Sequence, residues 1–471
     1  MKRKISILTF IVLAAAVCSA KVVLPSIFAN GMMLQQNEEV KIWGKAAPAE
    51  KVTVNGSWGA TAAATADKDG NWSTRLQTPE ASFNEQYLYV SGAENDIRIS
   101  DILIGEVWLC SGQSNMEFPV MRHAETGWQW GMLNEKEELQ DADYPEIRLY
   151  LESQQLSQFE EKFDCPGRWM KCHPANLEKF SAIGFVFGRR LFKELGVPVA
   201  VVECAWGGTH AESWTKPSLM QNNPKYKDEL EKFTDYHQLH KRPGTLWNGM
   251  VKPILGFTVK GNIWYQGESN WPRAEKYGYV FSTMLDNWRN DWEQPDMPFY
   301  YFLMAPNYLL PPELREQQMD VWQSGRKNLG MVALSDDGDS IDFHPRNKRL
   351  AGERIALWAL NKQYGRDVAC CGPVFKNMKI KGGKAVVTFN HAEKGLKTPN
   401  REKVVGFTVA GKDGVFYPAE AVIKGKKVEV SSPKVKEPAA VRFGWGKFYR
   451  ANLYNSADLP AFPFRTDRKT K

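Results

Sequence analysis

Apolar and polar residues alternate in short runs over the first part of the chain. Clear period-two runs are Val40-Lys-Ile-Trp43, Lys51-Val-Thr-Val54 and Gln86-Tyr-Leu-Tyr-Val90. Turn-forming residues separate such runs, as in Asp67-Lys-Asp-Gly70. Because side chains of a strand point alternately to its two faces, this pattern predicts an N-terminal β-sandwich domain over residues 21–101.

The pattern changes after Asp101, where the apolar runs become continuous. Five such runs are Glu106–Cys110, Pro198–Cys204, Asn262–Tyr265, Phe299–Leu303 and Met331–Leu334. Strands that are apolar on both sides must be covered on both faces, which is typical of a parallel sheet. Helical spacing of apolar residues is found near residues 180–195, 274–292 and 347–360. Residues 102–365 are therefore predicted to form an α/β domain with helices on both faces of the sheet.

Strand-like alternation returns beyond Gly372, for example in Ala385–Phe389 and Lys427–Val430. This predicts a C-terminal β domain over residues 366–471. A length of 471 residues also exceeds what one hydrophobic core usually supports, so two or three domains are expected. The two β segments either form separate modules or share one sandwich, and the sequence leaves this open.

The first 20 residues have the pattern of a secretory signal peptide. A basic head, Met1–Lys4, precedes a short apolar run and the small residues Ser19 and Ala20. The apolar run is shorter than a membrane-spanning helix needs, so we expect cleavage, a secreted or periplasmic location and no membrane span in the mature chain. In such a compartment disulfides persist, and Cys165 with Cys172 is the most plausible pair.

The overall charge balance adds little to this picture. The chain has 61 basic and 54 acidic residues, a formal net charge of +7. Three of the basic residues, Lys2, Arg3 and Lys4, belong to the signal segment. The remaining excess is too small to indicate a nucleic-acid partner.

Candidate chemistry lies in loops that follow the apolar runs, where α/β sheets bind ligands. The first run leads into a turn in which Gly112 permits a tight bend before Ser114. The last run leads into an Asp-rich loop that contains His344. A serine nucleophile needs an imidazole base, and the base needs a carboxylate, for which Asp342 is placed two residues away. Binding of a cation is the alternative role of this loop, although its spacing does not fit an EF-hand.

Two further loops follow the same kind of strand. Trp206-Gly-Gly-Thr209 offers backbone N–H groups, and Gln266-Gly-Glu-Ser-Asn270 offers side-chain amides. Both are suited to stabilising an oxyanion. Nucleophile, base, carboxylate and donors at one sheet edge together indicate acyl transfer.

These motifs resemble the sialate O-acetylesterase family within the SGNH hydrolases. The similarity rests on Cys110-Ser-Gly-Gln-Ser-Asn-Met116, Trp206-Gly-Gly-Thr209, Trp264-Tyr-Gln-Gly-Glu-Ser-Asn270 and Asp342-Phe-His-Pro-Arg-Asn-Lys348, and it extends over nearly the whole mature chain. The resemblance implies an SGNH-type, flavodoxin-like parallel sheet with helices on both faces, flanked by N- and C-terminal β-sandwich segments.

The resemblance also implies roles for individual residues. Ser114 would be the nucleophile, His344 the general base and Asp342 its partner. The oxyanion donors would be the Ser114 N–H, Gly208 and Gln266. SGNH hydrolases commonly place the acidic residue three before the histidine, where this chain has Ile341, so Asp339 stays an alternative to Asp342.

A second departure concerns the amide donor. The wider superfamily uses Asn, and this segment offers both Gln266 and Asn270. Asn270 and Trp206 are kept as candidates for substrate binding.

The implied activity is removal of O-acetyl groups from sugars through an acetyl-serine intermediate, with sialic acids as the first substrate and acetylated plant glycans such as xylan as the alternative. Such chemistry needs no metal or organic cofactor, and we expect neither. An O-acetylated carbohydrate is the expected partner. A non-catalytic carbohydrate-binding protein and a lipase are the remaining alternatives.

Overall fold

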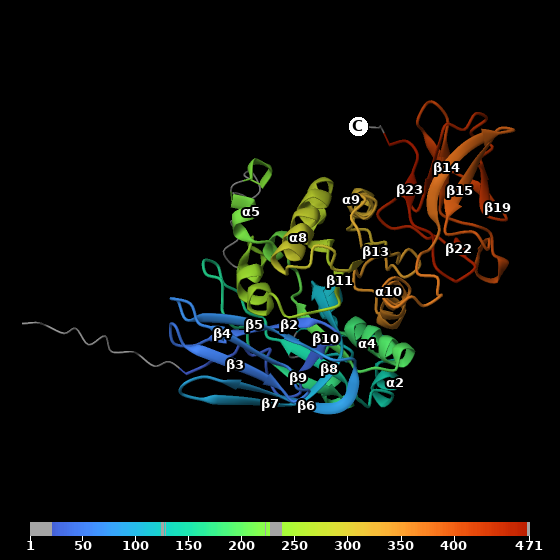
Figure 1. Cartoon of the computed structure of the whole chain (residues 1–471). Helices are drawn as coiled ribbons and strands as arrows, with labels where there is room; N and C mark the ends of the chain where they lie inside the picture. Colours follow the sequence, from blue (N-terminus) through green and yellow to red (C-terminus); the bar gives the residue numbers. More distant parts are fainter. Residues whose placement is uncertain (1–20, 124–126, 128, 222, 227–237, 469–471) are drawn as a thin grey trace, which may run out of the picture.

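The computed structural model describes residues 21–123, 127, 129–221, 223–226 and 238–468. The predicted signal segment, residues 1–20, lies outside the described residues. Figure 1 shows the N-terminal β part at one end of the molecule, the helices around a central sheet, and the C-terminal β module at the other end. The order β, α/β, β expected from the sequence is thus the order in space.

The central sheet has the strand order β13-β12-β11-β7-β10-β8-β9. Its strands are β7 (Asp96–Gly112), β8 (Tyr144–Glu152), β9 (Gly167–Cys172), β10 (Val199–Ala205), β11 (Gly261–Tyr265), β12 (Phe299–Phe302) and β13 (Leu329–Val332). Neighbouring strands from β13 to β8 are parallel, and only the edge strand β9 runs antiparallel to its neighbour. The predicted parallel core is confirmed, within a larger mixed sheet.

All five apolar runs are strands of this sheet, but β8 and β9 were not predicted. The reason is visible in β8, where Arg148 is buried although its sequence signal is polar. Its guanidinium donates to both carboxylate oxygens of Asp101, at 2.7 and 3.0 Å. A charge buried with its partner looks like a surface residue in a hydropathy pattern.

Helices cover both faces of the sheet, as the two adjacent tyrosines of β12 show. Tyr300 packs on Trp358 of α10 (Lys348–Lys362), and Tyr301 packs on Phe281 of α8 (Tyr277–Asp291). The three predicted helices are confirmed as α4 (Ala182–Leu195), α8 and α10. A fourth long helix, α9 (Pro312–Trp322), was not predicted. None of the helices in the described part of the chain is long and apolar enough to cross a membrane.

Shorter helices connect the main elements. They are α1 (Ser114–Glu117), α2 (Glu135–Gln140), α3 (Pro174–Leu177), α5 (Pro217–Gln221), α7 (Lys252–Ile254), a π-helical turn at Trp247–Val251, and 3-10 turns at Ala211–Trp214, Leu239–Lys241, Glu268–Lys276 and Pro399–Arg401.

The N-terminal β part is continuous with the central sheet. Its strands are β1 (Met33–Gln35), β2 (Glu39–Lys45), β3 (Lys51–Gly56), β4 (Thr61–Thr65), β5 (Asn71–Gln77) and β6 (Ser82–Ser91). β2 pairs with β5, while β1 and β6 pair with β7 and β3 extends that sheet. The single strand β7 therefore passes through the expected domain boundary at residue 101 and reaches the centre of the parallel sheet.

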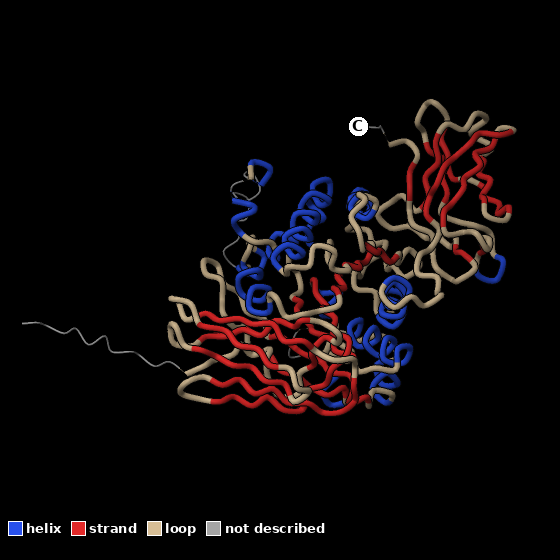
Figure 2. The backbone as a smooth tube through the Cα atoms, viewed as in Figure 1, coloured by secondary structure: helices blue, strands red, loops and turns tan. Residues whose placement is uncertain are grey.

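The C-terminal module has a core of its own. One antiparallel sheet has the order β14-β15-β20-β19 and the other β18-β17-β21-β23. The strands are β14 (Val374–Lys381), β15 (Lys384–Asn390), β16 (Leu396–Lys397), β17 (Phe407–Ala410), β18 (Phe416–Pro418), β19 (Glu420–Lys424), β20 (Lys427–Ser431), β21 (Ala440–Phe443), β22 (Tyr454–Asn455) and β23 (Phe464–Arg465). Figure 2 shows these strands well apart from those of the N-terminal part. The two β segments do not share one sandwich.

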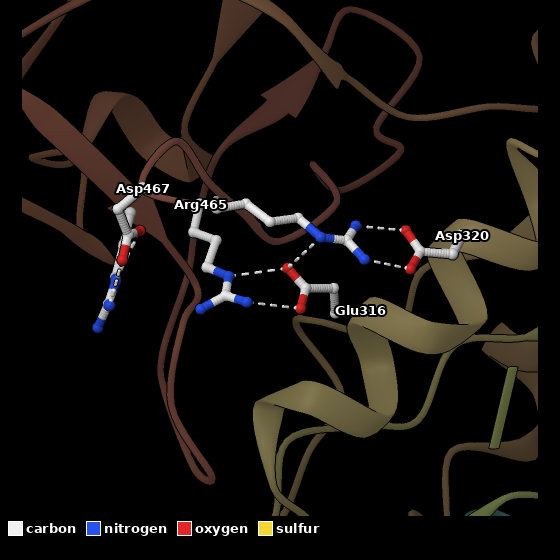
Figure 3. Close-up of polar contacts among 6 residues, drawn as sticks. Glu316, Asp320, Arg465 and Asp467 are labelled. Atoms are coloured by element: carbon white, nitrogen blue, oxygen red, sulfur yellow. Dashed lines mark hydrogen bonds and ion pairs between the residues drawn. The ribbon is translucent and has the colours of Figure 1, made fainter. Parts of the chain in front are cut away.

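Helix α9 contacts the C-terminal module through ion pairs and an aromatic pair. Arg465 and Arg468 each bind a carboxylate of α9, Glu316 and Asp320 respectively, through two nitrogens. Figure 3 shows these ion pairs crossing from the module to the helix. Beside them, the rings of Trp322 and Phe462 lie 5.0 Å apart.

The expected disulfide between Cys165 and Cys172 is not formed, and the six cysteines of the described residues are free thiols. β9 runs in extended conformation up to Cys172, so the two cysteines lie at opposite ends of it. At about 3.3 Å per residue the strand holds them roughly 20 Å apart, far beyond disulfide reach.

Candidate active site

The nucleophile candidate Ser114 lies in a sharp turn at the end of β7. Gly112 has φ of +139°, and a Cβ at this position would meet the carbonyl of Tyr265. Only glycine fits this approach of two backbones. Gln113 then donates its N–H to the Tyr265 carbonyl at 2.9 Å, and Ser114 begins helix α1.

Ser114, His344 and Asp342 come together although they are far apart in sequence. His344 Nε2 lies 2.9 Å from Ser114 Oγ. On the other side of the ring, His344 Nδ1 lies 3.2 Å from Asp342 Oδ1. The same carboxylate oxygen accepts the backbone N–H of His344 at 2.8 Å, which fixes the carboxylate beside the ring. The arrangement is that of a nucleophile, a base and an orienting carboxylate.

Asp339, the alternative partner of His344, has a different position. It accepts the backbone N–H groups of Ile341 and Asp342, at 2.8 and 2.9 Å. These bonds shape the turn that presents Asp342, and they hold the pKa of Asp339 below its usual range. Asp339 is therefore placed to form the loop, and Asp342 to contact the imidazole.

The surroundings of His344 favour its neutral form. Burial, and after it the positive charge of Lys348, lowers the pKa of His344 to about 4 against the opposing charge of Asp342. A histidine that is neutral at physiological pH can accept a proton from a serine hydroxyl.

Backbone N–H groups are available beside Ser114. Met116 and Glu117 donate their N–H groups to the Gln113 carbonyl, at 2.8 and 3.0 Å, whereas that of Ser114 meets no acceptor among the described residues. The loop after β10 comes so close that a Cβ on Gly207 would lie 3.3 Å from Ser114 Cβ. Gly207 donates its N–H to Glu117 at 2.5 Å, whereas that of Gly208 meets no acceptor among the described residues. Ser114 and Gly208 thus offer two donors for an oxyanion.

The side chain of Gln266 is not available as the third donor expected from the resemblance. It is fully buried, and its amide donates to Thr209 O at 3.1 Å and to Asn270 Oδ1 at 2.7 Å. Asn270 is buried too, and it also accepts from the Ala211 N–H and donates to Glu212. Both amides therefore tie the loop after β11 to the loop after β10, where they support the Gly208 turn.

Trp206, the other substrate-binding candidate, lies half-buried at the end of β10. Its ring stacks on that of His240 with a centroid distance of 5.1 Å and an angle of 7°. Nearby, a cavity of about 640 Å³ opens at the ends of β8 and β10 and reaches Glu117 of the Ser114 turn. Carboxylate, amide and cationic side chains line this cavity: Glu117, Glu152, Gln154, Arg168, Lys179 and Glu203.

Three buried residues behind Ser114 were not singled out in the sequence, namely Asn115, Glu268 and Lys348. Lys348 donates to Asn115, and Asn115 donates to Glu268. The available signal was Lys348 itself, because a cation in the first turn of a helix opposes the helix dipole. Within the described residues, no group of three or more His, Cys, Asp or Glu could hold a metal ion.

Comparison with known proteins agrees with the resemblance found in the motifs. Residues 104–360, more than half of the chain, match the family described as carbohydrate esterase, sialic acid-specific acetylesterase. Sialate O-acetylesterase of Mus musculus is 27% identical over 429 residues, 77% of this chain and 77% of the mouse protein. The Homo sapiens sialate O-acetylesterase is 27% identical over 326 residues, 63% of this chain and 60% of the human one.

A solved structure extends this likeness to three dimensions. The crystal structure of a carbohydrate acetylesterase from Xanthomonas citri matches with a TM-score of 0.84 and 32% sequence identity. The match covers 95% of this chain and 100% of the Xanthomonas citri chain. The chain is therefore a carboxylic ester hydrolase and belongs to the carbohydrate esterase family of sialic acid-specific acetylesterases.

Proposed function

We propose that this esterase removes O-acetyl groups from sugars by a serine mechanism on an SGNH-type fold. The observation that carries the proposal is the contact of 2.9 Å between His344 Nε2 and Ser114 Oγ, with Asp342 on the far side of the imidazole. A neutral imidazole at this distance can take the serine proton as the hydroxyl attacks.

In the first step, Ser114 Oγ attacks the acetyl carbonyl carbon while its proton passes to His344. The resulting oxyanion accepts hydrogen bonds from the backbone N–H groups of Ser114 and Gly208. Collapse breaks the bond to the sugar oxygen, which takes the proton from His344, and leaves an acetyl-serine. Water, deprotonated by His344, then attacks this ester and releases acetate, and the proton returns to Ser114.

Two residues act through others in this scheme. Asp342 holds the ring of His344 in the tautomer with a proton on Nδ1 and stabilises the imidazolium that forms. The resemblance implies Gln266 as an oxyanion donor, but here its amide supports the loop that carries Gly208. The proposed oxyanion site therefore rests on two backbone N–H groups.

The sugar is proposed to lie in the cavity beside Glu117. Its volume of about 640 Å³ is suitable for a ligand of one or a few rings, and its polar lining can bind hydroxyl groups. Sialic acids are the first substrate class, since Arg168 and Lys179 at the cavity can pair with a sugar carboxylate. The carboxyl and amide side chains of the same lining can bind the hydroxyl groups of a neutral plant glycan, which is the second candidate.

The mechanism is tested with p-nitrophenyl acetate and purified protein. Wild type should release p-nitrophenol, and Ser114→Ala should lose activity by about 10⁴-fold or more while keeping its unfolding temperature. A Ser114→Ala variant with wild-type turnover would reject the nucleophile.

The substrate is tested separately, by acetate release from O-acetylated sialic acid and from acetylated xylo-oligosaccharides at equal ester concentration. A higher kcat/KM on the sialic acid supports the first class, and the reverse order replaces it by the second. We further propose that the protein acts outside the cytoplasm after removal of residues 1–20. Fractionation of producing cells, with N-terminal sequencing of the product, tests this location.

A further inference from the structure

A chain of hydrogen bonds runs behind Ser114 and His344. Lys348 Nζ donates to Asn115 Oδ1 at 2.5 Å. Asn115 Nδ2 donates to Glu268 Oε1 at 2.5 Å and to the carbonyl of Phe343 at 2.9 Å. All three side chains are buried, with at most 3% of the surface of Asn115, Glu268 or Lys348 exposed.

These hydrogen bonds join the parts of the site whose relative positions matter for the reaction. Asn115 directly follows Ser114, and Phe343 directly precedes His344. Lys348 is the first residue of α10, and Glu268 begins the 3-10 turn after β11. Asn115 thus fastens the nucleophile turn to the base loop, while Lys348 and Glu268 hold its side-chain amide from two further elements.

Lys348 occupies a place that costs stability. A buried ammonium loses its hydration, and the positive end of the α10 dipole repels it. The rings of Phe118 and Tyr265, 4.5 and 5.6 Å from Nζ, offset part of this cost by cation–π attraction. Residues that break a local rule at a reaction centre are typical of function.

We propose that Asn115, Glu268 and Lys348 form a buried positioning unit that keeps Ser114 Oγ at reaction distance from His344. We also propose that the charge of Lys348 extends the base function of His344 to acidic pH. This inference rests on the proposed roles of Ser114 and His344.

The effect of Lys348 on the pH dependence follows from the charges around it. Burial lowers the pKa of Lys348 to about 7, although the acidic groups Asp337, Glu268 and Asp342 favour its charged form. Burial raises the pKa of Glu268 to about 7. It also raises the pKa of Asp337 to about 7, where the negative charge of Asp336 adds to the shift and the positive charges of Lys348 and Arg354 oppose it.

Lys348 is bonded to Asn115, which also bonds the carbonyl of Phe343, and its Nζ lies 4.5 Å from the ring of Phe118. The Phe118 ring lies beside that of His344 at a centroid distance of 6.2 Å. From this position the charge of Lys348 opposes protonation of His344, which Asp342 favours.

The charge is tested by the pH dependence of kcat/KM for p-nitrophenyl acetate between pH 3.5 and 8. Lys348→Met keeps the length of the side chain and removes its charge and its bond to Asn115. We expect the acidic limb to move up by about one pH unit and activity at pH 8 to fall about 10- to 100-fold. Lys362→Met, at the exposed far end of α10, is the control and should leave both unchanged.

A purely structural role of Lys348 would lower activity without moving the limb. An unmoved limb in folded Lys348→Met, or an equal shift in Lys362→Met, overturns the charge effect.

The positioning part is tested at Glu268, whether or not Lys348→Met folds. Glu268→Gln keeps an oxygen acceptor for Asn115, and Glu268→Leu removes the acceptor at similar volume. We expect kcat within about threefold of wild type for the first and a loss of about 10- to 100-fold for the second. Equal kcat values in folded Glu268→Gln and Glu268→Leu would overturn the proposed positioning role of the three residues. Inactivity of Ser114→Ala alongside that result shows that the positioning unit fails and the serine mechanism stands.

Discussion

The two β parts of the molecule support opposite halves of the active site in different ways. The N-terminal part shares strand β7 with the catalytic sheet, and Ser114 follows the end of that strand. The C-terminal module packs its own core and touches the catalytic part through side chains and loops. Ser114 is therefore positioned by backbone that is continuous with the N-terminal part, whereas the loop that carries His344 meets the C-terminal module through side-chain contacts.

Contacts of the C-terminal module converge on the loop that carries His344. Tyr454 donates its hydroxyl proton to Asp336 at 3.0 Å, and Ser335 donates to the carbonyl of Ala461 at 2.9 Å. Asp336 is held from the other side by the guanidinium of Arg354, with both bonds at 2.7 Å. The module thus steadies the start of the base loop, several residues before His344.

The strongest test of the comparison lies within the base loop. Asp342→Asn should lower kcat by about 10³-fold or more, because the amide neither stabilises the imidazolium nor selects the productive tautomer. Asp339→Asn should cost far less, since an amide oxygen can still accept the N–H groups of Ile341 and Asp342. Steady-state kinetics at pH 7.5 decides, and the reverse order of the two losses would make Asp339 the orienting residue.

On the nucleophile side, Gly112→Ala should damage the fold itself. The methyl group meets the Tyr265 backbone at φ of +139°, so we expect the free energy of unfolding to fall by roughly 3 kcal/mol or more. Gly382→Ala is the matched control in the C-terminal module, at φ of +56° with open space around the added Cβ. It should cost about 1 kcal/mol. Chemical denaturation measures both, and equal losses would show that backbone approach at Gly112 is unimportant.

The central sheet was predictable because its strands are apolar on both faces, as in Val199–Ala205, and every residue of that strand is buried. β8 was missed because the partner of Arg148 is Asp101, 47 residues earlier in the chain. The sequence carries no record of that pairing. Long-range partners therefore limit what a pattern of hydrophobic positions can show.

The same limit applies to the site. The meeting of Ser114 and His344 followed from strand ends at one sheet edge, which topology brings together. The role of Gln266 did not follow, because its amide could serve an oxyanion or a neighbouring loop and only the fold selects Thr209 and Asn270. The choice between Asp342 and Asp339 likewise depended on a turn whose shape the spacing does not reveal.

A smaller effect is expected where the C-terminal module meets the base loop. Tyr454→Phe removes one hydrogen bond to Asp336 and should lower the free energy of unfolding by about 1 kcal/mol, with a loss in kcat of a few fold. Tyr417→Phe, on β18 in the same module, is the control and should leave kcat unchanged. Kinetics and thermal unfolding of both variants test whether the module supports catalysis. Wild-type kcat in Tyr454→Phe would limit the module to a structural role.

The smallest effect is expected at the ion pairs of Figure 3. The side chains of Asp320 and Arg468 are 35% and 42% exposed, so water and salt weaken their attraction. Asp320→Asn should lower the free energy of unfolding by less than about 1 kcal/mol, and kcat should stay within about twofold. The stability difference from wild type should shrink further in 1 M NaCl, as thermal unfolding can show. A large loss of kcat would mean that docking through α9, rather than the contacts at Ser335 and Asp336, sets the position of the base.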